Sequence, residues 1–177
     1  VNVAGPYSKD LNRLYPDSAR LVFKNEVYQG RASLARSLGE LTTVRVGGEA
    51  QYNPFINLYN SYSIDSSELF SAAFLEGDIF ITRKLVARAG MRVDHSYLLR
   101  AINIAPRLSV AYKLAKYDQV SFAYGDFYQT PDKRYLQFTN LNKFEKATHY
   151  IVNFQHVDNK RTFRIEGYYK HYENLVK

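Results

Sequence analysis

The side chains best suited to metal or acid–base chemistry in this sequence are four histidines, His95, His149, His156 and His171. Imidazole nitrogens bind zinc when they recur at a short fixed spacing with cysteine or carboxylate partners. No pair of these histidines has a recognised ligand spacing with carboxylates around it, and the chain has no cysteine. The sequence therefore predicts no metal site and no other cofactor.

Nucleophilic catalysis and phosphate binding also lack their usual patterns. A serine hydrolase holds its nucleophile in a Gly-x-Ser-x-Gly turn, and no serine here lies in one. The pair Gly47-Gly48 is not a phosphate loop, because a glycine pair inside a strand more often marks a bulge or a close backbone approach. We predict that the chain is not an enzyme.

The net charge of +7 raises the question of a nucleic-acid partner. The basic residues are spread singly along the chain, however, and do not gather in a patch or beside an aromatic platform. We therefore expect no nucleic-acid partner. No run of apolar residues approaches the roughly 18 that a spanning helix needs, so a helical membrane protein is also excluded.

The elements that must position any functional side chain have a period of two, which is typical of β-strands. Apolar residues alternate with polar or small ones in three predicted hairpins, with turns near 82–84, 116–118 and 158–160. Two further strands are predicted at about 20–36 and 41–53, around a turn at 37–40. These segments predict an all-β chain of about eight strands.

The connections between these strands alternate in length. The turns named above are short, whereas the predicted connections at 53–67, 95–105 and 128–145 are long. An up-and-down sheet with this pattern has all its short turns at one end and all its long loops at the other. Transmembrane β-barrels of the outer membrane have that asymmetry, and strands of about 9 to 11 residues suffice to cross a bilayer at a tilt.

One face of the alternating strands carries charges of both signs, including Arg92, Asp94 and Arg107. Periodicity alone allows a soluble sheet in which these groups point to water. The loop asymmetry favours a membrane barrel, in which they face a wet lumen and the apolar face meets lipid. Four tyrosines would then lie in the aromatic girdles of the barrel, although each also suits ordinary cross-strand packing: Tyr112, Tyr124, Tyr150 and Tyr169.

Several segments resemble TonB-dependent outer-membrane receptors, particularly those of Bacteroidetes-type bacteria. The matching text is GMRVDHS at 90–96, the stretch from Ile104 to Phe138 with YGDFYQTP inside it, NKFEKATHYIVNFQ at 142–155 and the terminal RTFRIEGYYKHYENLVK. In that family a GxRxD strand end is followed by a PRLS-type hairpin entry, a YGxFxQxP-like exit and a KxEKxxxY re-entry. This succession covers about half of the chain, and AAFLEGDIFITRKLVARAG at 72–90 extends it more weakly.

The resemblance implies an antiparallel up-and-down transmembrane β-barrel of about 22 strands with an N-terminal plug domain. This chain provides about eight strands and no plug, so we expect residues 1–177 to be a barrel fragment. The family resemblance places it in the bacterial outer membrane, where its partners are outer-membrane lipid and, through the missing plug domain, the TonB complex. A surface lipoprotein that caps the barrel is a further partner left open.

By the same resemblance, the function is the binding and import of a scarce nutrient such as an iron chelate, a cofactor or a glycan. Candidate substrate-binding residues fall in two groups, one in the predicted loop after residue 127 and one on the predicted lumen face. The loop group is Tyr128, Gln129, Arg134, Tyr135, Asn140 and Asn142; the lumen group is Arg92, Asp94 and Arg107. The loop residues also fit a role in shielding the barrel mouth.

Two alternatives remain at this point. A soluble eight-stranded up-and-down barrel could hold a small apolar ligand, in which case the apolar residues would line the cavity and the charges would face solvent. A complete small outer-membrane barrel could have a structural or adhesive role. The direction in which the apolar faces point separates the soluble alternative from the other two.

Overall fold

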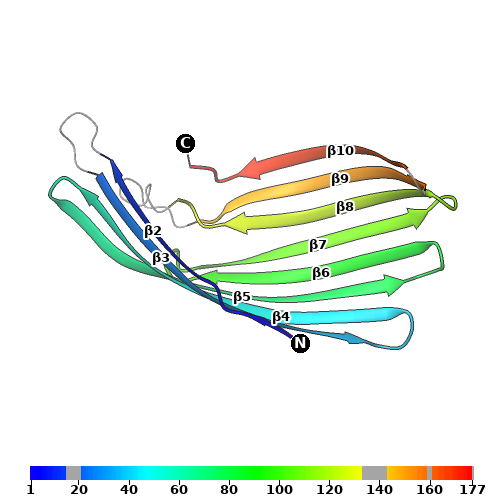
Figure 1. Cartoon of the computed structure of the whole chain (residues 1–177), viewed down its shortest axis with the longest axis horizontal. Coiled ribbons are helices and arrows are strands. Elements are labelled where there is room, and N and C mark those ends of the chain that lie inside the picture. The colour runs from blue at the N-terminus through cyan, green and yellow to red at the C-terminus, as the bar shows by residue number, and fades with distance from the viewer. Residues whose placement is uncertain (15–20, 133–142, 159–160, 177) are drawn as a thin grey trace.

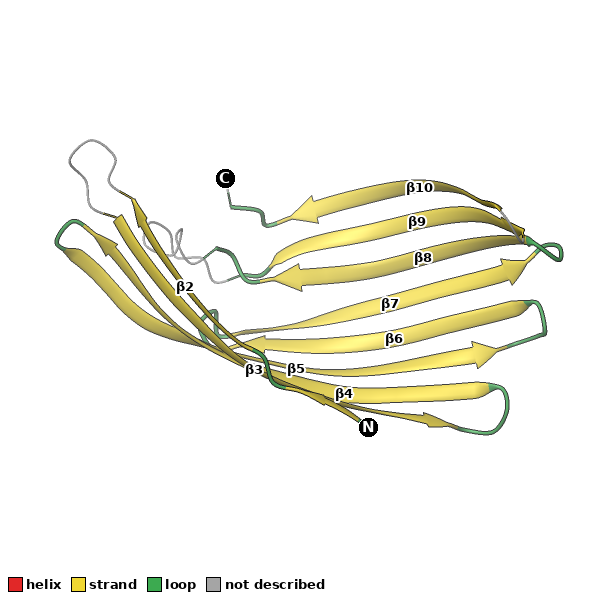
Figure 2. Ribbon diagram, in the orientation of Figure 1, coloured by secondary structure: helices red, strands yellow, loops and turns green. Residues whose placement is uncertain are grey.

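The computed structural model describes residues 1–14, 21–132, 143–158 and 161–176. Within these ranges the chain forms one curved antiparallel sheet (Figure 1) and no helix (Figure 2). Its strands are β1 (Asn2–Ala4), β2 (Tyr7–Leu14), β3 (Leu21–Ser37), β4 (Thr42–Tyr59), β5 (Tyr62–Phe80), β6 (Leu85–Ser96), β7 (Ala101–Lys113), β8 (Asp118–Gln129), β9 (Glu145–Asp158) and β10 (Arg161–Glu173).

The strands follow one another in up-and-down order from β3 to β10, and β1 and β2 pair with successive parts of β3. The all-β antiparallel fold is therefore confirmed, with ten strands in place of about eight. Within the described residues β10 pairs with β9 alone, and β1 and β2 pair with β3 alone, so the sheet is open at both edges.

Two of the three predicted long connections are wrong. The turn between β4 and β5 is Asn60-Ser61, and residues 97–100 join β6 to β7, with Asn60 and Arg100 in the left-handed conformation. The strands run on through the segments predicted as loops, 53–67 and 95–105. Apolar and polar residues are mixed on one face there, as with Phe55 and Asn57 on β4, so the apolar alternation is irregular, and this mixture does not prevent strand pairing.

Pro54 shows why the far half of β4 is hard to identify from the sequence. Proline has no backbone N–H to donate, and the register of β3 with β4 is interrupted between the pairs Asn25↔Phe55 and Tyr28↔Tyr52. Pairing of β4 with β5 is continuous across the same position, where Pro54 lies opposite Ser67. A single proline thus interrupts one ladder and leaves the strand intact.

The third long connection, between β8 and β9, is confirmed in its extent, since β8 ends at Gln129 and β9 begins at Glu145. Short turns lie between β3 and β4, between β5 and β6 and between β7 and β8, as predicted. The candidate loop residues Arg134, Tyr135, Asn140 and Asn142 fall outside the described residues.

The cross-strand register places apolar residues in continuous rows on one face of the sheet. One such row joins Leu34, Val46, Leu75, Met91 and Pro106 across five strands. Leu75 is 54% exposed and Met91 is 52% exposed. The apolar side chains in these unbroken rows are exposed, whereas a water-soluble protein buries most of its apolar side chains.

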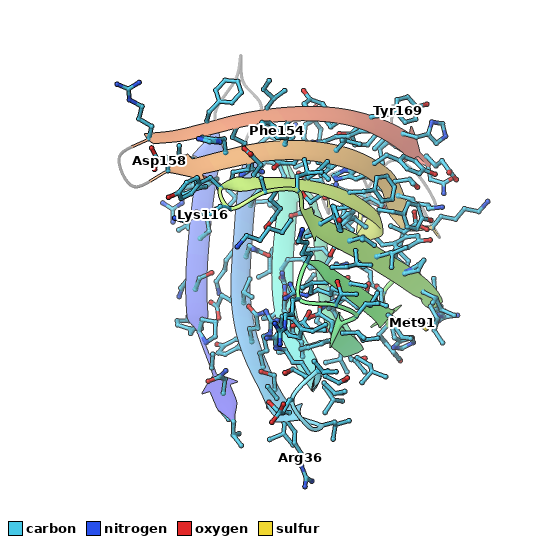
Figure 3. The ribbon with its side chains drawn as sticks, turned by 90° about the vertical axis from the view of Figure 1, so that its right-hand side faces the viewer. Arg36, Met91, Lys116, Phe154, Asp158 and Tyr169 are labelled. Carbon is cyan, nitrogen blue, oxygen red and sulfur yellow. The ribbon has the colours of Figure 1, made fainter. Side chains whose placement is uncertain are left out.

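The opposite face carries most of the buried polar side chains. Glu68 and Asp94 are each 3% exposed and Ser96 is fully buried. Arg31 on β3 and Arg107 on β7 line the same small cavity although three strands separate them in the sheet, so this face is the concave one. The curvature of the sheet, with side chains on both faces, is seen in Figure 3.

Gly47 lets an aromatic ring lie flat on the concave face. A Cβ atom there would lie 2.4 Å from the Phe74 ring and 2.7 Å from the backbone oxygen of Ala32. Gly47 and Phe74 are direct partners in the register of β4 with β5. The close approach predicted for the pair Gly47-Gly48 is therefore confirmed at Gly47, and the regular register there excludes a bulge.

We predict that Gly47→Ala destabilises the fold by about 1–3 kcal/mol, because the new methyl group overpacks against the Phe74 ring and a backbone oxygen. Gly48→Ala is the matched control, since its Cβ would meet its nearest atom at an ordinary 3.5 Å. Denaturant unfolding of the lipid-refolded protein measures both. Equal stability of the two variants would contradict the close packing at Gly47.

Candidate functional site

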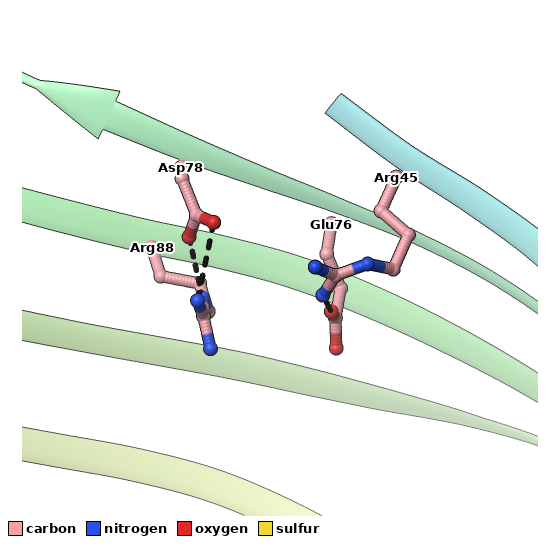
Figure 4. Close-up of polar contacts among 4 residues, drawn as sticks. All are labelled: Arg45, Glu76, Asp78 and Arg88. Atoms are coloured by element: carbon pink, nitrogen blue, oxygen red, sulfur yellow. Dashed lines mark hydrogen bonds and ion pairs between the residues drawn. The ribbon is translucent and has the colours of Figure 1, made fainter. Parts of the chain in front are cut away.

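The concave face is crossed by ion pairs that join neighbouring strands. The Arg45 guanidinium on β4 donates to the Glu76 carboxylate on β5 at 3.1 Å, and Arg88 on β6 binds both carboxylate oxygens of Asp78 on β5 (Figure 4). Opposite charges on adjacent strands stabilise a register when they share a face. These pairs fix charged side chains on the surface that the sequence predicts to line a lumen.

Two of the predicted lumen residues meet further along this face. Arg92 donates from Nε to Asp94 Oδ1 at 2.6 Å and lies 3.5 Å from the Glu49 carboxylate on β4. Gln29 on β3 donates to the same Glu49 at 2.9 Å, which extends the network over four strands. Arg92 and Asp94 therefore belong to one polar network.

The third predicted lumen residue, Arg107, lies on the same face and has no carboxylate partner within the described ranges. Its guanidinium packs over the Phe127 ring at 4.7 Å, and its buried Nε–H has no acceptor there. Arg107 lines a cavity together with Arg92 but lies outside the network that Arg92 forms with Asp94 and Glu49. The structure thus brings all three predicted residues to one wall and links only two of them.

A buried polar cluster on the concave face, at the end away from the short turns, gave no signal in the sequence. We call the concave face the wall and this end of it the loop end. Ser96 Oγ donates to the Glu68 carboxylate at 3.1 Å and accepts the backbone N–H of Leu99 at 3.2 Å. Leu99 is itself 4% exposed, so the β6–β7 turn folds onto the concave face. Glu68 and Ser96 lay near predicted long loops, where the sequence provided no signal for a fixed position.

A recess of about 240 Å³ opens on the concave face over β5 to β9. Gly90 and Gly125, which flank Arg107 in one cross-strand row, provide its floor, and Phe127 and His149 contribute aromatic rings 4.8 Å apart. Glycines in a row leave room above the backbone that larger residues would fill. The concave face therefore has a recess beside Arg88 and Arg107, and this recess could receive a group from another molecule or segment.

The convex face carries two ladders of tyrosine. Tyr7, Tyr28 and Tyr52 stack across β2, β3 and β4 with ring centroids 4.8 and 6.4 Å apart. Tyr124, Tyr150 and Tyr169 do so across β8, β9 and β10 at 5.2 and 6.1 Å. Three of the four tyrosines predicted for aromatic girdles are thus neighbours in one ladder, while Tyr112 lies near the turn end of β7, opposite Leu85 and Val120.

Charged groups lie on the convex face beyond each ladder, on the side away from the short turns. Beyond Tyr28, Glu26 lies 3.4 Å from Lys9 and 3.3 Å from Lys24. Beyond Tyr124, Asp126 accepts a 2.7 Å hydrogen bond from Thr148 and lies 3.5 Å from Lys146. Tyrosine followed by charge marks the boundary between an apolar and a wet environment.

The apolar band between the short turns and the ladders has the height of a membrane. From Thr42 to Tyr52 a strand rises about 33 Å, which becomes about 25 Å along an axis tilted by about 40°. The apolar belt of outer-membrane barrels is about 25 Å tall. We infer that the tyrosine ladders mark one edge of this band.

The band also crosses the sheet obliquely. Followed from strand to strand through direct partners, Tyr150 on β9 lies level with Val44 on β4, which is closer to the short turns than Tyr52. Thr42 at the start of β4 lies level with Val152 on β9, and β9 continues beyond that level to Asp158. Both edges of the band therefore shift in the same direction from β4 to β9. Strands tilted against a membrane normal produce this shift.

The predicted loop residues Tyr128 and Gln129 are strand residues, which corrects their assignment to a loop. They pair with Lys146 and Glu145 of β9, and the Gln129 amide donates to the Glu145 carboxylate at 2.5 Å. Tyr128 also packs edge-on against the buried Phe144 ring at 6.4 Å. β8 continues past its apolar alternation through these residues because β9 pairs with it as far as Gln129.

Among the residues that the structure describes, no group of three histidine, cysteine, aspartate or glutamate side chains could hold a metal ion. His156, near the short turns, lies 2.6 Å from the Asp118 carboxylate, and His149 faces the recess.

A search of the described part of the chain for a helix long and apolar enough to span a membrane finds none.

Solved structures with a similar fold are siderophore receptors and a copper transporter. The siderophore receptor PirA from Pseudomonas aeruginosa matches 96% of this chain with a TM-score of 0.76 and 15% identity. A mutant of the ferric enterobactin receptor PfeA from Pseudomonas aeruginosa matches 88% with a TM-score of 0.74 and 14% identity, and the copper transporter OprC matches 94% with 0.68 and 17%.

These similarities show the fold alone, an antiparallel sheet like part of the wall of a β-barrel. The chain spans 36% of the PirA chain, 27% of the PfeA chain and 34% of the OprC chain. No family model and no curated protein matches the sequence.

We predict that arginine has unequal effects at two adjacent positions of β7. Val110→Arg puts a charge inside the apolar band, between Ala87 and Phe122, and destabilises the protein by about 2–4 kcal/mol in lipid. Ser109→Arg is the control, because Ser109 lines the recess on the polar face, and we expect a change within about 1 kcal/mol. Denaturant titration after refolding into vesicles measures both, and equal losses would contradict the assignment of the faces.

Proposed function

We propose that this chain is part of the barrel wall of a TonB-dependent receptor that imports a scarce nutrient across a bacterial outer membrane. The observation that carries the proposal is the inverted distribution of side chains. Exposed apolar rows cover the convex face, and cross-strand ionic networks cover the concave face. Such a sheet is stable where hydrocarbon surrounds it and water fills its interior.

The soluble alternative predicts the opposite arrangement. A soluble barrel that holds an apolar ligand needs apolar residues on the concave face. Here that face bears Arg45, Glu76, Asp78, Arg88 and Arg92 in cross-strand networks. The observed faces therefore argue against this alternative.

The open edges argue against a complete small barrel. In lipid every backbone polar group needs a partner, so a spanning sheet must close on itself. The outer edge of β10 is unpaired over the whole strand, and each of its residues is exposed. We propose that further strands of the same receptor pair with this edge and with that of β1 and β2.

The proposed transport mechanism is carried over from the sequence resemblance. In the family that the sequence resembles, a plug closes the lumen at rest, and energy delivered by the TonB complex would move that plug. Substrate would first bind at the loop end, where β4 and β5 project beyond the tyrosine ladder. Binding roles for Tyr128 and Gln129, and for the loop residues Arg134, Tyr135, Asn140 and Asn142, are part of this proposal.

The substrate is proposed to be a scarce metal chelate, because the solved structures of similar fold are named as siderophore receptors and a copper transporter. A cofactor or a glycan is the alternative within the same class. The Bacteroidetes-type assignment and a capping surface lipoprotein are carried over from the sequence resemblance as further proposals.

We predict that growth on the cognate nutrient as sole source requires both this receptor and the TonB complex. A strain that lacks the receptor gene and a strain that lacks TonB should lose uptake of labelled ferric siderophores, or of the alternative nutrient, to the same background level. Uptake that persists without TonB, in a strain where it still depends on the receptor gene, would contradict the proposal and indicate a passive pore.

A further inference from the structure

Two arginines of the concave face, Arg31 and Arg107, have no carboxylate partner among the residues that the structure describes. Arg45 and Arg92, their neighbours at the same cavity, are paired with Glu76 and with Glu49 and Asp94 respectively. The cavity has a volume of about 90 Å³, and four arginines and one carboxylate line it. Its lining therefore carries an excess of positive charge.

Both unpaired guanidinium groups are held in place by the same construction. The Phe74 ring lies across Gly47, and Arg31 stacks on that ring at 5.4 Å. The Phe127 ring lies over Gly125, where a Cβ atom would be 3.2 Å away, and Arg107 stacks on it at 4.7 Å. Stacking restrains a guanidinium and leaves its N–H edge available to an acceptor.

An unpaired buried donor indicates that an acceptor is missing. The Arg107 Nε–H is buried and has no acceptor, which costs free energy unless a partner fills the site. Nearer the loop end of the same wall, the amides of Asn53 and Asn103 also have buried atoms without partners. The wall is therefore shaped to be covered by polar groups beyond those of these strands.

We propose that the cavity between Arg31 and Arg107 binds a small oxyanion, a carboxylate or a phosphate. Planar guanidinium groups bind such groups with two parallel hydrogen bonds, and the cavity has room for one of them. The proposal rests on the proposed function in one respect, namely that the concave face lines a lumen. The oxyanion is either a free solute or the side chain of another polypeptide segment inside the barrel.

The test uses the full-length receptor that contains this chain, refolded in lipid, and the variants Arg31→Gln and Arg107→Gln. Arg83→Gln is the matched control, since Arg83 lies exposed in the β5–β6 turn and its loss changes the net charge equally. The temperature at which the barrel unfolds is measured in rising inorganic phosphate against chloride at constant ionic strength. A free-solute site raises this temperature with phosphate, and each cavity variant weakens the apparent affinity at least about tenfold.

A polypeptide source is detected by a second variant, Arg107→Lys, treated with a water-soluble carbodiimide. The carbodiimide activates a nearby carboxylate as an O-acylisourea. The lysine amine attacks the activated carboxyl carbon and forms an amide, and the carbodiimide leaves as its urea. Mass spectrometry then identifies the linked peptide. A link to a carboxylate outside the wall strands supports the proposal, and Arg83→Lys should give no such link.

The proposal is overturned if phosphate has no effect on wild-type receptor and Arg107→Lys links to Glu76 alone or to nothing. TonB-dependent uptake by the same variants is scored separately in cells that contain the TonB complex. Failure of the oxyanion test with uptake intact would therefore reject the cavity and leave the proposed function in place.

Discussion

The pairing of backbone hydrogen bonds across strands is the constraint on which the rest of this structure depends. Each interior strand is paired on both sides, so the sheet needs no hydrophobic core to satisfy its backbone. Its side chains can then face hydrocarbon on one side of the sheet and water on the other. Rows such as Leu34–Val46–Leu75–Met91 face outward, and networks such as Glu49–Arg92–Asp94 face inward. The same constraint explains why an open edge like that of β10 calls for further strands.

The parts of the fold that the sequence predicts are those inside the apolar band. There one face is apolar and the other polar, so residues such as Leu108 and Arg107 can be assigned to faces from alternation alone. Beyond the tyrosine ladders apolar and polar residues are mixed on the same face, and the strand signal weakens although pairing continues. This is why the sequence predicts a loop at the adjoining ends of β4 and β5 and places Tyr128 and Gln129 outside β8.

The sequence predicts which residues lie on the concave face but not which of them form pairs. Alternation placed Arg92, Asp94 and Arg107 on one face, but which charges meet depends on register and curvature, which single-strand patterns do not contain. Gly47 and Gly125 acquire their role only through the rings that lie on them, and those rings in turn position Arg31 and Arg107. In each case the glycine makes room for the aromatic ring, and the ring positions the arginine.

The central claim is that the apolar face of the sheet contacts hydrocarbon, and accessibility of spin labels along β7 tests it most directly. The chain has no cysteine, so single cysteines at positions 107 to 112 can be labelled without background. In lipid-reconstituted full-length receptor we predict a period of two. Labels at Leu108, Val110 and Tyr112 should be relaxed by oxygen, and labels at Arg107, Ser109 and Ala111 by a water-soluble nickel chelate. Uniform relaxation by the nickel chelate along the strand, or the opposite phase, would contradict the account.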